Sequence, residues 1–162
     1  MTIAVGTRLP EATLLRMGAK GPEQVALSTL LTGRKVVIFG FPGAFTGTCT
    51  TAHVPSFIRT KAKFDAKGVD EIIGISVNDP FVMQRFGEST GATAAGITML
   101  GDSASELTTA IGMNFDVPAT GFHARSKRYA AYVVDGVVQH LSAPETPGVC
   151  ETSSGEAMLE VI

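Results

Sequence analysis

Apolar residues along this chain fall into two alternating patterns. Lys35–Phe41 (KVVIFGF) and Glu71–Val77 (EIIGISV) are continuous apolar runs rich in valine and isoleucine, which is typical of strands buried on both faces of a sheet. Between these runs, apolar residues recur at helical spacing, which predicts a helix over Thr48–Lys67. Gly68 is expected to end this helix, because glycine tolerates the left-handed conformation that follows a helix.

The rest of the chain continues the alternation of strands and helices. Asn78 and Asp79 stand before Pro80, which predicts a capped helix that runs to about Glu88. The remaining elements are expected, in chain order, as a strand over Ile97–Leu100, a helix from Asp102 or Ser103 to Ile111, a long loop over Met113–Ser126, a hairpin of Arg128–Val134 and Val137–Leu141 that turns at Asp135-Gly136, and a helix from Ser153 to the end. Residues 1–33 are ambiguous, and a short hairpin is one interpretation of them.

This order of elements predicts an α/β fold with a central mixed sheet flanked by helices on both faces. The 162 residues contain no internal repeat and no linker long enough to divide domains. A single domain over residues 1–162 is therefore expected.

Composition narrows the class of protein. Hydrophobic residues make up 44% and charged residues 17% of the chain, which excludes an intrinsically disordered protein. A net charge of −2 argues against binding to nucleic acid or to an anionic membrane. No apolar run is long enough to span a membrane. No secretory signal is expected in the first residues, because Met1–Leu9 has no basic flank followed by an apolar stretch. The two cysteines, Cys49 and Cys150, exclude a disulfide-stapled scaffold and favour a cytoplasmic location with reduced thiols.

Cys49 is the residue most indicative of chemistry. It follows a buried strand and a Gly/Pro loop and lies near the start of the predicted helix. Unpaired backbone N–H groups and the helix dipole stabilise an anion there, so a thiolate is favoured over a thiol. The alternative is a cysteine that serves only as a small buried apolar residue. Because open α/β sheets place their sites at such strand ends, we favour the reactive thiolate.

Three other residues extend this hypothesis. Pro42, Thr46 and Cys49 have the spacing P-x-x-x-T-x-x-C. The Thr46 hydroxyl either faces the sulfur or only caps the helix, and Pro42 stiffens the exit from the strand. Arg128 closes the basic segment 125–128 at the entrance of a strand. Its guanidinium could stabilise a nearby thiolate and bind substrate oxygens, although a basic segment is more often a solvated face.

His53 lies one helical turn after Cys49. A Cys/His nucleophile pair and a two-ligand metal site are conceivable, but neither has a convincing third member. A half-buried structural histidine is therefore the favoured interpretation. Pro55 falls inside the predicted helix and removes the hydrogen bond to residue 51, so a kink is expected there.

The segment Phe41–Phe57 (FPGAFTGTCTTAHVPSF) resembles the active-site segment of the peroxiredoxins, in particular of their atypical (type II) subfamily. The similarity continues in Ile75–Met83 (ISVNDPFVM), in Arg125–Tyr129 (RSKRY) and in the late segment 147–159. It covers residues 3–160 in order and without large gaps. PGAFT-x-x-C together with VNDPFVM is highly specific for this family.

The resemblance implies a thioredoxin-like fold and a thiol peroxidase of antioxidant defence and redox homeostasis. Cys49 then matches the peroxidatic cysteine, which attacks H2O2 or an alkyl hydroperoxide and becomes a sulfenic acid. Thr46 and Arg128 match the residues that hold the thiolate and the peroxide, and Pro42 matches the proline that screens the pocket. The resemblance implies neither a cofactor nor a metal. It also implies a homodimer through the active-site loop and the segment 78–83.

The sequence leaves open how the sulfenic acid is reduced. Cys150 lies near the place where other members carry a resolving cysteine, although the register is slightly offset. Glutathione, glutaredoxin or thioredoxin acting directly on Cys49 is the alternative. Gly74 occupies the place of the resolving cysteine of some plant-type members, so that route is absent. Gly47 replaces a proline that many members carry, which should loosen the loop.

Three other functions compete with this interpretation. A dithiol–disulfide oxidoreductase on the same fold needs Cys-x-x-Cys, and Thr46 occupies the first of those positions. A redox-sensing or chaperone-like binding protein would use the same scaffold without turnover. A cysteine hydrolase would need an ordered Cys–His–Asn set, which the sequence lacks.

Overall fold

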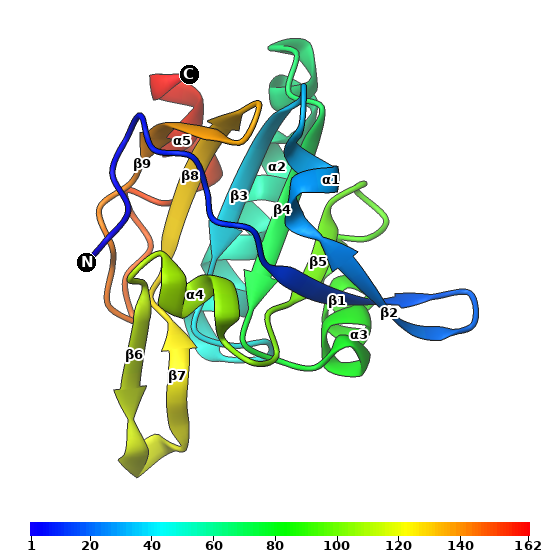
Figure 1. Ribbon diagram of the computed structural model, residues 1–162, viewed down its shortest axis with the longest axis vertical. Helices are drawn as coiled ribbons and strands as arrows, with labels where there is room; N and C mark the ends of the chain where they lie inside the picture. Colours follow the sequence, from blue (N-terminus) through cyan, green and yellow to red (C-terminus); the bar gives the residue numbers. More distant parts are fainter.

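The computed structural model describes residues 1–162 and has a seven-stranded mixed sheet at its centre (Figure 1). The strand order is β2-β1-β5-β4-β3-β8-β9. Its strands are β1 (Thr13–Gly18), β2 (Gly21–Ala26), β3 (Lys35–Gly40), β4 (Glu71–Ser76), β5 (Thr98–Gly101), β8 (Tyr129–Val134) and β9 (Val137–Leu141). A separate two-stranded sheet consists of β6 (Asn114–Val117) and β7 (Phe122–Ser126).

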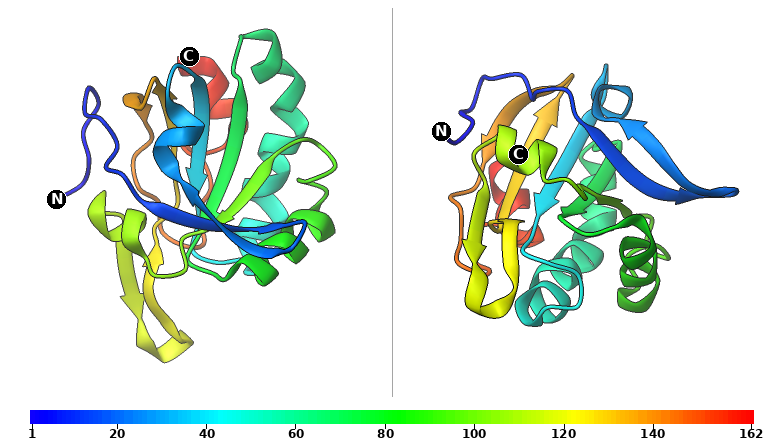
Figure 2. Two further views of the ribbon diagram at one scale, coloured as in Figure 1. Left: turned by 45° about the vertical axis from the view of Figure 1, so that its right-hand side comes forward. Right: turned by 60° about the horizontal axis from the view of Figure 1, so that its bottom comes forward.

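Helices cover both faces of the large sheet (Figure 2). They are α1 (Leu27–Leu31), a π-helical turn η1 (Cys49–His53) that continues into α2 (Val54–Ala66), α3 (Pro80–Thr90), α4 (Glu106–Ala110), a short 3-10 turn η2 (Pro118–Thr120) and α5 (Gly155–Val161). α1 and α4 pack on one face, and α2, α3 and α5 pack on the other. This three-layer α/β arrangement confirms the predicted fold class. None of the helices has both the length and the apolar character needed to cross a membrane.

Two apolar clusters, one on each face, hold these layers together. The cluster under α1 and α4 is mostly aliphatic, whereas the cluster under α2, α3 and α5 is rich in phenylalanine. In the second cluster the rings of Phe39 in β3 and Phe57 in α2 stack at 4.3 Å between centroids. β3 contributes to both clusters because it is buried on both faces, as its continuous apolar run predicts.

The pairing of β3 with its neighbours brings distant parts of the chain to one edge of the sheet. β3 runs parallel to β4 and antiparallel to β8, and Gly40 at the end of β3 lies opposite Tyr129 at the start of β8. The residue before β8 therefore emerges beside the loop that follows β3. That residue is Arg128, so the register of two strands decides where its side chain can reach.

Several sequence predictions are confirmed at single residues. The N-terminal hairpin exists as β1 and β2. The β8–β9 turn uses Asp135 and Gly136 with φ of 48° and 78°, the positive values that a type I′ turn requires. Asp79 caps α3, because its side chain accepts a hydrogen bond from the Val82 N–H at 2.9 Å.

The prediction of a long loop over Met113–Ser126 is wrong. β6 and β7 form an antiparallel hairpin there, which extends away from the main sheet (Figure 1). It has a register shift between Phe115 and Val117 and a positive φ at Ala124. β6 (NFDV) and β7 (FHARS) do alternate polar and apolar residues, but they are only 4 and 5 residues long and most of their residues are only partly buried. So short a pattern does not distinguish a strand from a loop.

α4 begins later than predicted. Neither Asp102 nor Ser103 is its first cap residue, because the helix starts only at Glu106. The buried Asp102 carboxylate nevertheless accepts hydrogen bonds from the N–H groups of Leu107 and Thr108, at 3.3 and 2.8 Å. The helix is thus capped from a residue several positions before its start.

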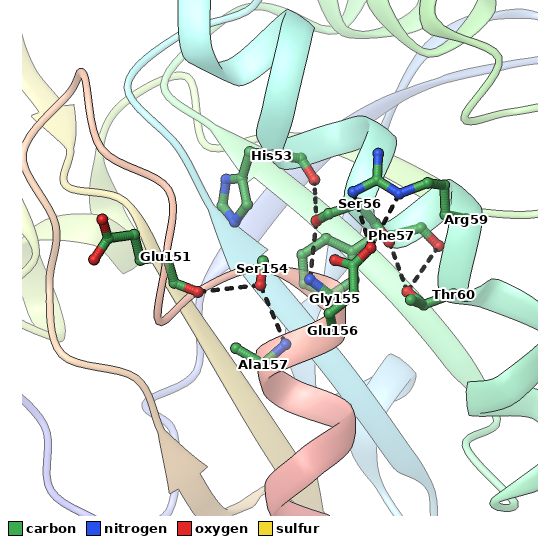
Figure 3. A network of polar contacts seen from close by, with 10 residues as sticks. All are labelled: His53, Ser56, Phe57, Arg59, Thr60, Glu151, Ser154, Gly155, Glu156 and Ala157. Carbon is green, nitrogen blue, oxygen red and sulfur yellow. Dashed lines mark hydrogen bonds and ion pairs between the residues drawn. The ribbon is translucent and has the colours of Figure 1, made fainter.

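α5 is docked onto α2 by close polar contacts (Figure 3). The Gly155 N–H donates to the Ser56 hydroxyl at 2.9 Å, and that hydroxyl donates to the His53 carbonyl at 2.7 Å. A Cβ atom added at Gly155 would lie 2.6 Å from the Ser56 carbonyl oxygen and against the Thr60 hydroxyl. The two helices therefore approach to a distance that only glycine permits.

We expect Gly155→Ala to lower the free energy of unfolding by about 1–3 kcal/mol, the usual effect of overpacking. The better helix propensity of alanine, about 1 kcal/mol, opposes this loss but is smaller than the clash with backbone atoms. Urea unfolding measures the difference. Gly148→Ala is the control, since a Cβ there meets nothing within 4 Å. A Gly155→Ala protein as stable as the wild type would contradict this account of the helix contact.

Candidate active site

The site is built on the loop after β3 and on the helix that follows it. Cys49 is the first residue of the π turn, and the Val54 N–H bonds to the Cys49 carbonyl, five residues back. Pro55 explains the wide turn, because its ring cannot approach the carbonyl four residues earlier as in an α-helix. The kink expected at Pro55 is therefore replaced by a π turn just before it. π turns are frequent at functional sites.

The sulfur of Cys49 is completely buried, with 0% of the residue exposed. It accepts hydrogen bonds from Thr46 Oγ1 at 2.9 Å and from Arg128 Nη2 at 3.3 Å. The structure thus brings together three of the residues singled out from the sequence. Two donors around one sulfur favour the thiolate, which accepts hydrogen bonds more strongly than a neutral thiol does.

The Arg128 guanidinium is buried without a carboxylate partner. No Asp or Glu side chain forms an ion pair with it, although the residue is fully buried. Besides the sulfur, Nη2 also binds the Pro147 carbonyl at 2.8 Å. Nε has no partner at all. A buried cation needs a compensating charge, and the Cys49 sulfur is the group placed to supply it.

His53 holds the other end of this guanidinium. Its Nδ1 lies 3.0 Å from Arg128 Nη1, and its Nε2 lies 3.0 Å from the Ser153 carbonyl. A carbonyl can only accept, so Nε2 carries the proton and Nδ1 accepts from the arginine. Burial, with the Arg128 charge beside it, lowers the pKa of His53 to about 3. The imidazole is therefore neutral at any physiological pH.

This arrangement corrects the expected burial of His53. The histidine is fully buried, not half-buried, and both ring nitrogens are occupied by Arg128 and Ser153. It is therefore not paired with Cys49 as a base. No group of three or more His, Cys, Asp or Glu residues is arranged to hold a metal ion. The sequence pointed to His53 by its spacing from Cys49, but its contact with Arg128 depends on strand register and could not be predicted.

The Thr46 hydroxyl has one proton to donate and two acceptors within hydrogen-bond distance. Its Oγ1 lies 2.7 Å from the Gly43 carbonyl and 2.9 Å from the Cys49 sulfur. The single hydroxyl proton is therefore shared between the carbonyl and the sulfur. The hydroxyl does not cap the helix by accepting a backbone N–H. The Thr46 carbonyl starts the helix instead, by accepting from the Thr50 N–H at 3.1 Å.

Pro42 is connected to a second arginine that the sequence analysis left without a role. Pro42 is buried at the start of the loop, and its carbonyl accepts from Arg125 Nη1 at 3.1 Å. The Arg125 guanidinium also lies over the Phe122 ring at 5.2 Å. A Cβ at Gly43 would lie 2.6 Å from Arg125 Nη1, so the loop passes close to the arginine. Because the hairpin carrying Arg125 was predicted as loop, the direction of this side chain could not be foreseen.

The two other positions of interest lie outside this set of contacts. Cys150 is half-buried in the loop before α5. Burial raises the pKa of its thiol, although the nearby Arg128 charge acts in the opposite direction. At Gly74 a Cβ would meet Met99 and Phe39 at 2.7 and 2.8 Å. The packing at Gly74 therefore leaves no room for a cysteine side chain without rearrangement.

Comparisons with known proteins agree on one family. The sequence profile of the Redoxin family matches residues 4–159. The chain is 44% identical to Peroxiredoxin-2E-2, chloroplastic, of Oryza sativa subsp. japonica, over 99% of this chain and 73% of that protein. It is 37% identical to Peroxiredoxin-2B of Arabidopsis thaliana, over 99% and 98% of the two chains. The structure of reduced Prx3 from Vibrio vulnificus in complex with H2O2 has a TM-score of 0.90 at 41% identity, with 98% of each chain covered.

The low pKa of His53 gives a prediction about stability. In the unfolded chain the histidine binds a proton near its ordinary pKa of 6.5, whereas in the folded protein it stays neutral down to about 3. The free energy of unfolding should therefore fall below pH 6.5, by an amount approaching about 1.4 kcal/mol per pH unit from this group. His53→Gln, which cannot titrate, should lack this contribution. Urea unfolding of both proteins between about pH 5 and pH 6.5 tests it, and parallel curves would contradict a neutral buried imidazole.

Proposed function

The chain belongs to the type II peroxiredoxins of the Redoxin family and is a thiol peroxidase with the thioredoxin-like fold; on this premise we propose that Cys49 is the residue that reacts with the peroxide. One observation carries the proposal. The buried sulfur accepts hydrogen bonds from Thr46 and Arg128, and the cation beside it has no other negative partner. The thiolate is the nucleophilic form of cysteine.

In the proposed reaction the Cys49 thiolate attacks one oxygen of the peroxide. A sulfur–oxygen bond forms while the oxygen–oxygen bond breaks, and Cys49 becomes a sulfenic acid. The departing oxygen takes up a proton and leaves as water from H2O2 or as an alcohol from an alkyl hydroperoxide. Negative charge moves from the sulfur onto the oxygens in the transition state. Thr46 and Arg128 are the donors assigned to stabilise it, and the free Nε–H of Arg128 is available for a peroxide oxygen.

Pro42 is assigned a different task in this proposal. It is buried where the loop leaves β3, and it carries no N–H that water could bind. Its carbonyl is held by Arg125, which fixes the start of the loop against the β6–β7 hairpin. Pro42 is thus assigned to screen the Cys49 sulfur from bulk water, which strengthens the hydrogen bonds around it.

The reductant is the second part of the proposal. We assign regeneration to an external thiol, supplied by glutathione, glutaredoxin or thioredoxin. The thiol attacks the sulfenic sulfur, the sulfur–oxygen bond breaks and water leaves, which gives a mixed disulfide; a second thiol then attacks this disulfide and releases Cys49. Cys150 is the internal competitor. Because burial raises the pKa of the Cys150 thiol, little of it is thiolate at neutral pH. This favours the external route.

The oligomeric state is a third proposal. Phe45 in the active-site loop and Phe81 in α3 are 54% and 60% exposed. The loop is joined to the residues before α3 through a hydrogen bond from the Ala44 N–H to Asn78 Oδ1 at 3.0 Å. Exposed aromatic residues on neighbouring segments are typical of protein–protein interfaces. We propose that a second copy of this chain covers them in a homodimer.

Cys49→Ser should abolish peroxidase turnover, because a serine hydroxyl is not ionised at neutral pH. Turnover is measured by the loss of H2O2 in the presence of glutathione and glutaredoxin, or of thioredoxin and its reductase. Cys150→Ser is the matched variant and should retain turnover with at least one of these reductants. Activity remaining in Cys49→Ser would refute the assignment of the nucleophile. Loss of turnover in Cys150→Ser with every reductant would refute the external route and make Cys150 the resolving cysteine.

Phe81→Arg should convert the proposed dimer into a monomer, because a cation replaces an apolar side chain at the interface. Sedimentation velocity of the reduced protein measures the change. Val5→Arg is the control, since Val5 is 58% exposed on the N-terminal segment, away from the active-site loop. A wild-type protein that sediments as a monomer, or a Phe81→Arg protein that remains dimeric, would exclude this interface.

A further inference from the structure

Glu145 is joined to Arg128 through the backbone. The Glu145 N–H donates to the Arg128 carbonyl at 2.9 Å, and the Arg128 N–H donates to the Glu145 carbonyl at 3.4 Å. This isolated antiparallel bridge lies outside the named strands. The residue that follows Glu145 begins the loop that carries Pro147 and Cys150.

The Glu145 side chain holds the far end of the same loop. Its carboxylate accepts hydrogen bonds from the N–H groups of Glu151, Thr152 and Ser153, at 2.7, 3.1 and 3.1 Å. It also accepts one from the Ser153 hydroxyl. Burial alone would raise the pKa of this carboxyl, but the Ser153 hydroxyl and the three N–H groups outweigh burial and lower it. The carboxylate is therefore charged at neutral pH, and Glu145 closes the loop 146–152 at both ends.

Besides the Cys49 sulfur, the Arg128 guanidinium contacts His53 and Pro147, and both of these contacts depend on the loop 146–152 that Glu145 closes. Ser153, which the Glu145 carboxylate binds, is linked to Arg128 through His53. The Ser153 carbonyl accepts from His53 Nε2, and His53 Nδ1 accepts from Arg128 Nη1. The Pro147 carbonyl, inside the loop, accepts from Arg128 Nη2. Glu145, Ser153, His53 and Arg128 thus form a closed ring of hydrogen bonds, which we call the Arg128 ring.

We propose that Glu145 is a positioning residue of the peroxidase: through the Arg128 ring and the Pro147 carbonyl, its carboxylate fixes the guanidinium against the Cys49 sulfur. This inference rests on the proposed role of Cys49. Glu145 does not touch the sulfur or the guanidinium nitrogens. Its effect on the reaction is carried by Ser153, His53 and Pro147.

A positioning role and a simple charge effect have opposite signs at Cys49. If Glu145 acted only through its negative charge, its removal would favour the thiolate and move Cys49 alkylation to lower pH. If it acts by holding Arg128 in place, its removal weakens the contact of the guanidinium with the sulfur. Alkylation then moves to higher pH. The direction of the shift distinguishes the two effects without reference to its size.

The experiment measures the pH dependence of Cys49 alkylation by iodoacetamide, followed by mass spectrometry of the Cys49 peptide. We expect Glu145→Gln to raise the midpoint by about one pH unit and to lower the rate constant with H2O2 at pH 7 about tenfold, because the thiolate fraction falls tenfold per unit. Glu151→Gln is the matched control. It removes a carboxylate from the same loop, and this carboxylate makes no hydrogen bond or ion pair, so the midpoint should stay within about 0.2 unit. His53 does not interfere, since its pKa is about 3.

A second measurement shows whether the effect passes through Arg128. In an Arg128→Lys background, where the guanidinium contacts are already lost, adding Glu145→Gln should shift the midpoint by less than about 0.3 pH unit and change the rate constant by less than about twofold. If Glu145→Gln does not fold, as judged by circular dichroism, Ser153→Ala replaces it, because it removes one of the four contacts of the carboxylate. Ser153→Ala should shift the midpoint in the same direction by a smaller amount.

Two outcomes would overturn the inference. One is an unchanged or lowered midpoint in a folded Glu145→Gln protein, or in Ser153→Ala where that variant replaces it. The other is a full effect of Glu145→Gln in the Arg128→Lys background. Either result leaves the proposed function intact if Cys49→Ser still abolishes turnover. An active Cys49→Ser protein would remove the proposed function first, so the two failures are distinguishable.

Discussion

The contact between the Arg128 guanidinium and the Cys49 sulfur is the interaction on which the site depends. The arginine is fully buried and has no carboxylate partner, so the Cys49 sulfur is the group placed to balance its charge. Neither residue could reach the other without the rest of the fold. The antiparallel register of β8 against β3 brings Arg128 to the end of β3. The loop after β3 and the π turn then place the sulfur within 3.3 Å of Nη2.

The surroundings of Arg128 keep its charge available for the sulfur. A carboxylate in direct contact would neutralise the guanidinium and remove its effect on the thiol. The neutral imidazole of His53 and the carbonyl of Pro147 orient it without neutralising it. The carboxylate of Glu145, which pairs with Arg128 only through the backbone, is directed to backbone N–H groups and to the Ser153 hydroxyl instead. The protein thus separates the task of holding the arginine from the task of balancing its charge.

The sequence predicted the parts of the fold that local patterns specify. β3 and β4 follow from continuous apolar runs, the β8–β9 turn follows from Asp135-Gly136, and the start of α3 follows from Asp79-Pro80. The β6–β7 hairpin was missed because it extends from the body of the protein and most of its side chains are only partly buried. At the site, the proximity of Thr46 to Cys49 could be predicted from their spacing, since both lie where one loop passes into a helix.

The contacts of Arg125 and His53 join segments about 75 to 100 positions apart, and the ring through Glu145 is closed only by the two His53 contacts. They are products of tertiary register, which no local pattern encodes.

On the proposed role of Cys49, the complete burial of its sulfur has a consequence for the reduction that must follow its oxidation. Peroxide is small, but a tripeptide thiol or a partner protein is far bulkier than the space around a fully covered atom. The oxidised cysteine must therefore swing outward, with local unwinding of the π turn, before any such donor can form a bond with it. The rate of that unwinding is therefore the maximum rate at which the oxidised cysteine can be reduced. Once it is reached, adding more reducing agent no longer accelerates recovery.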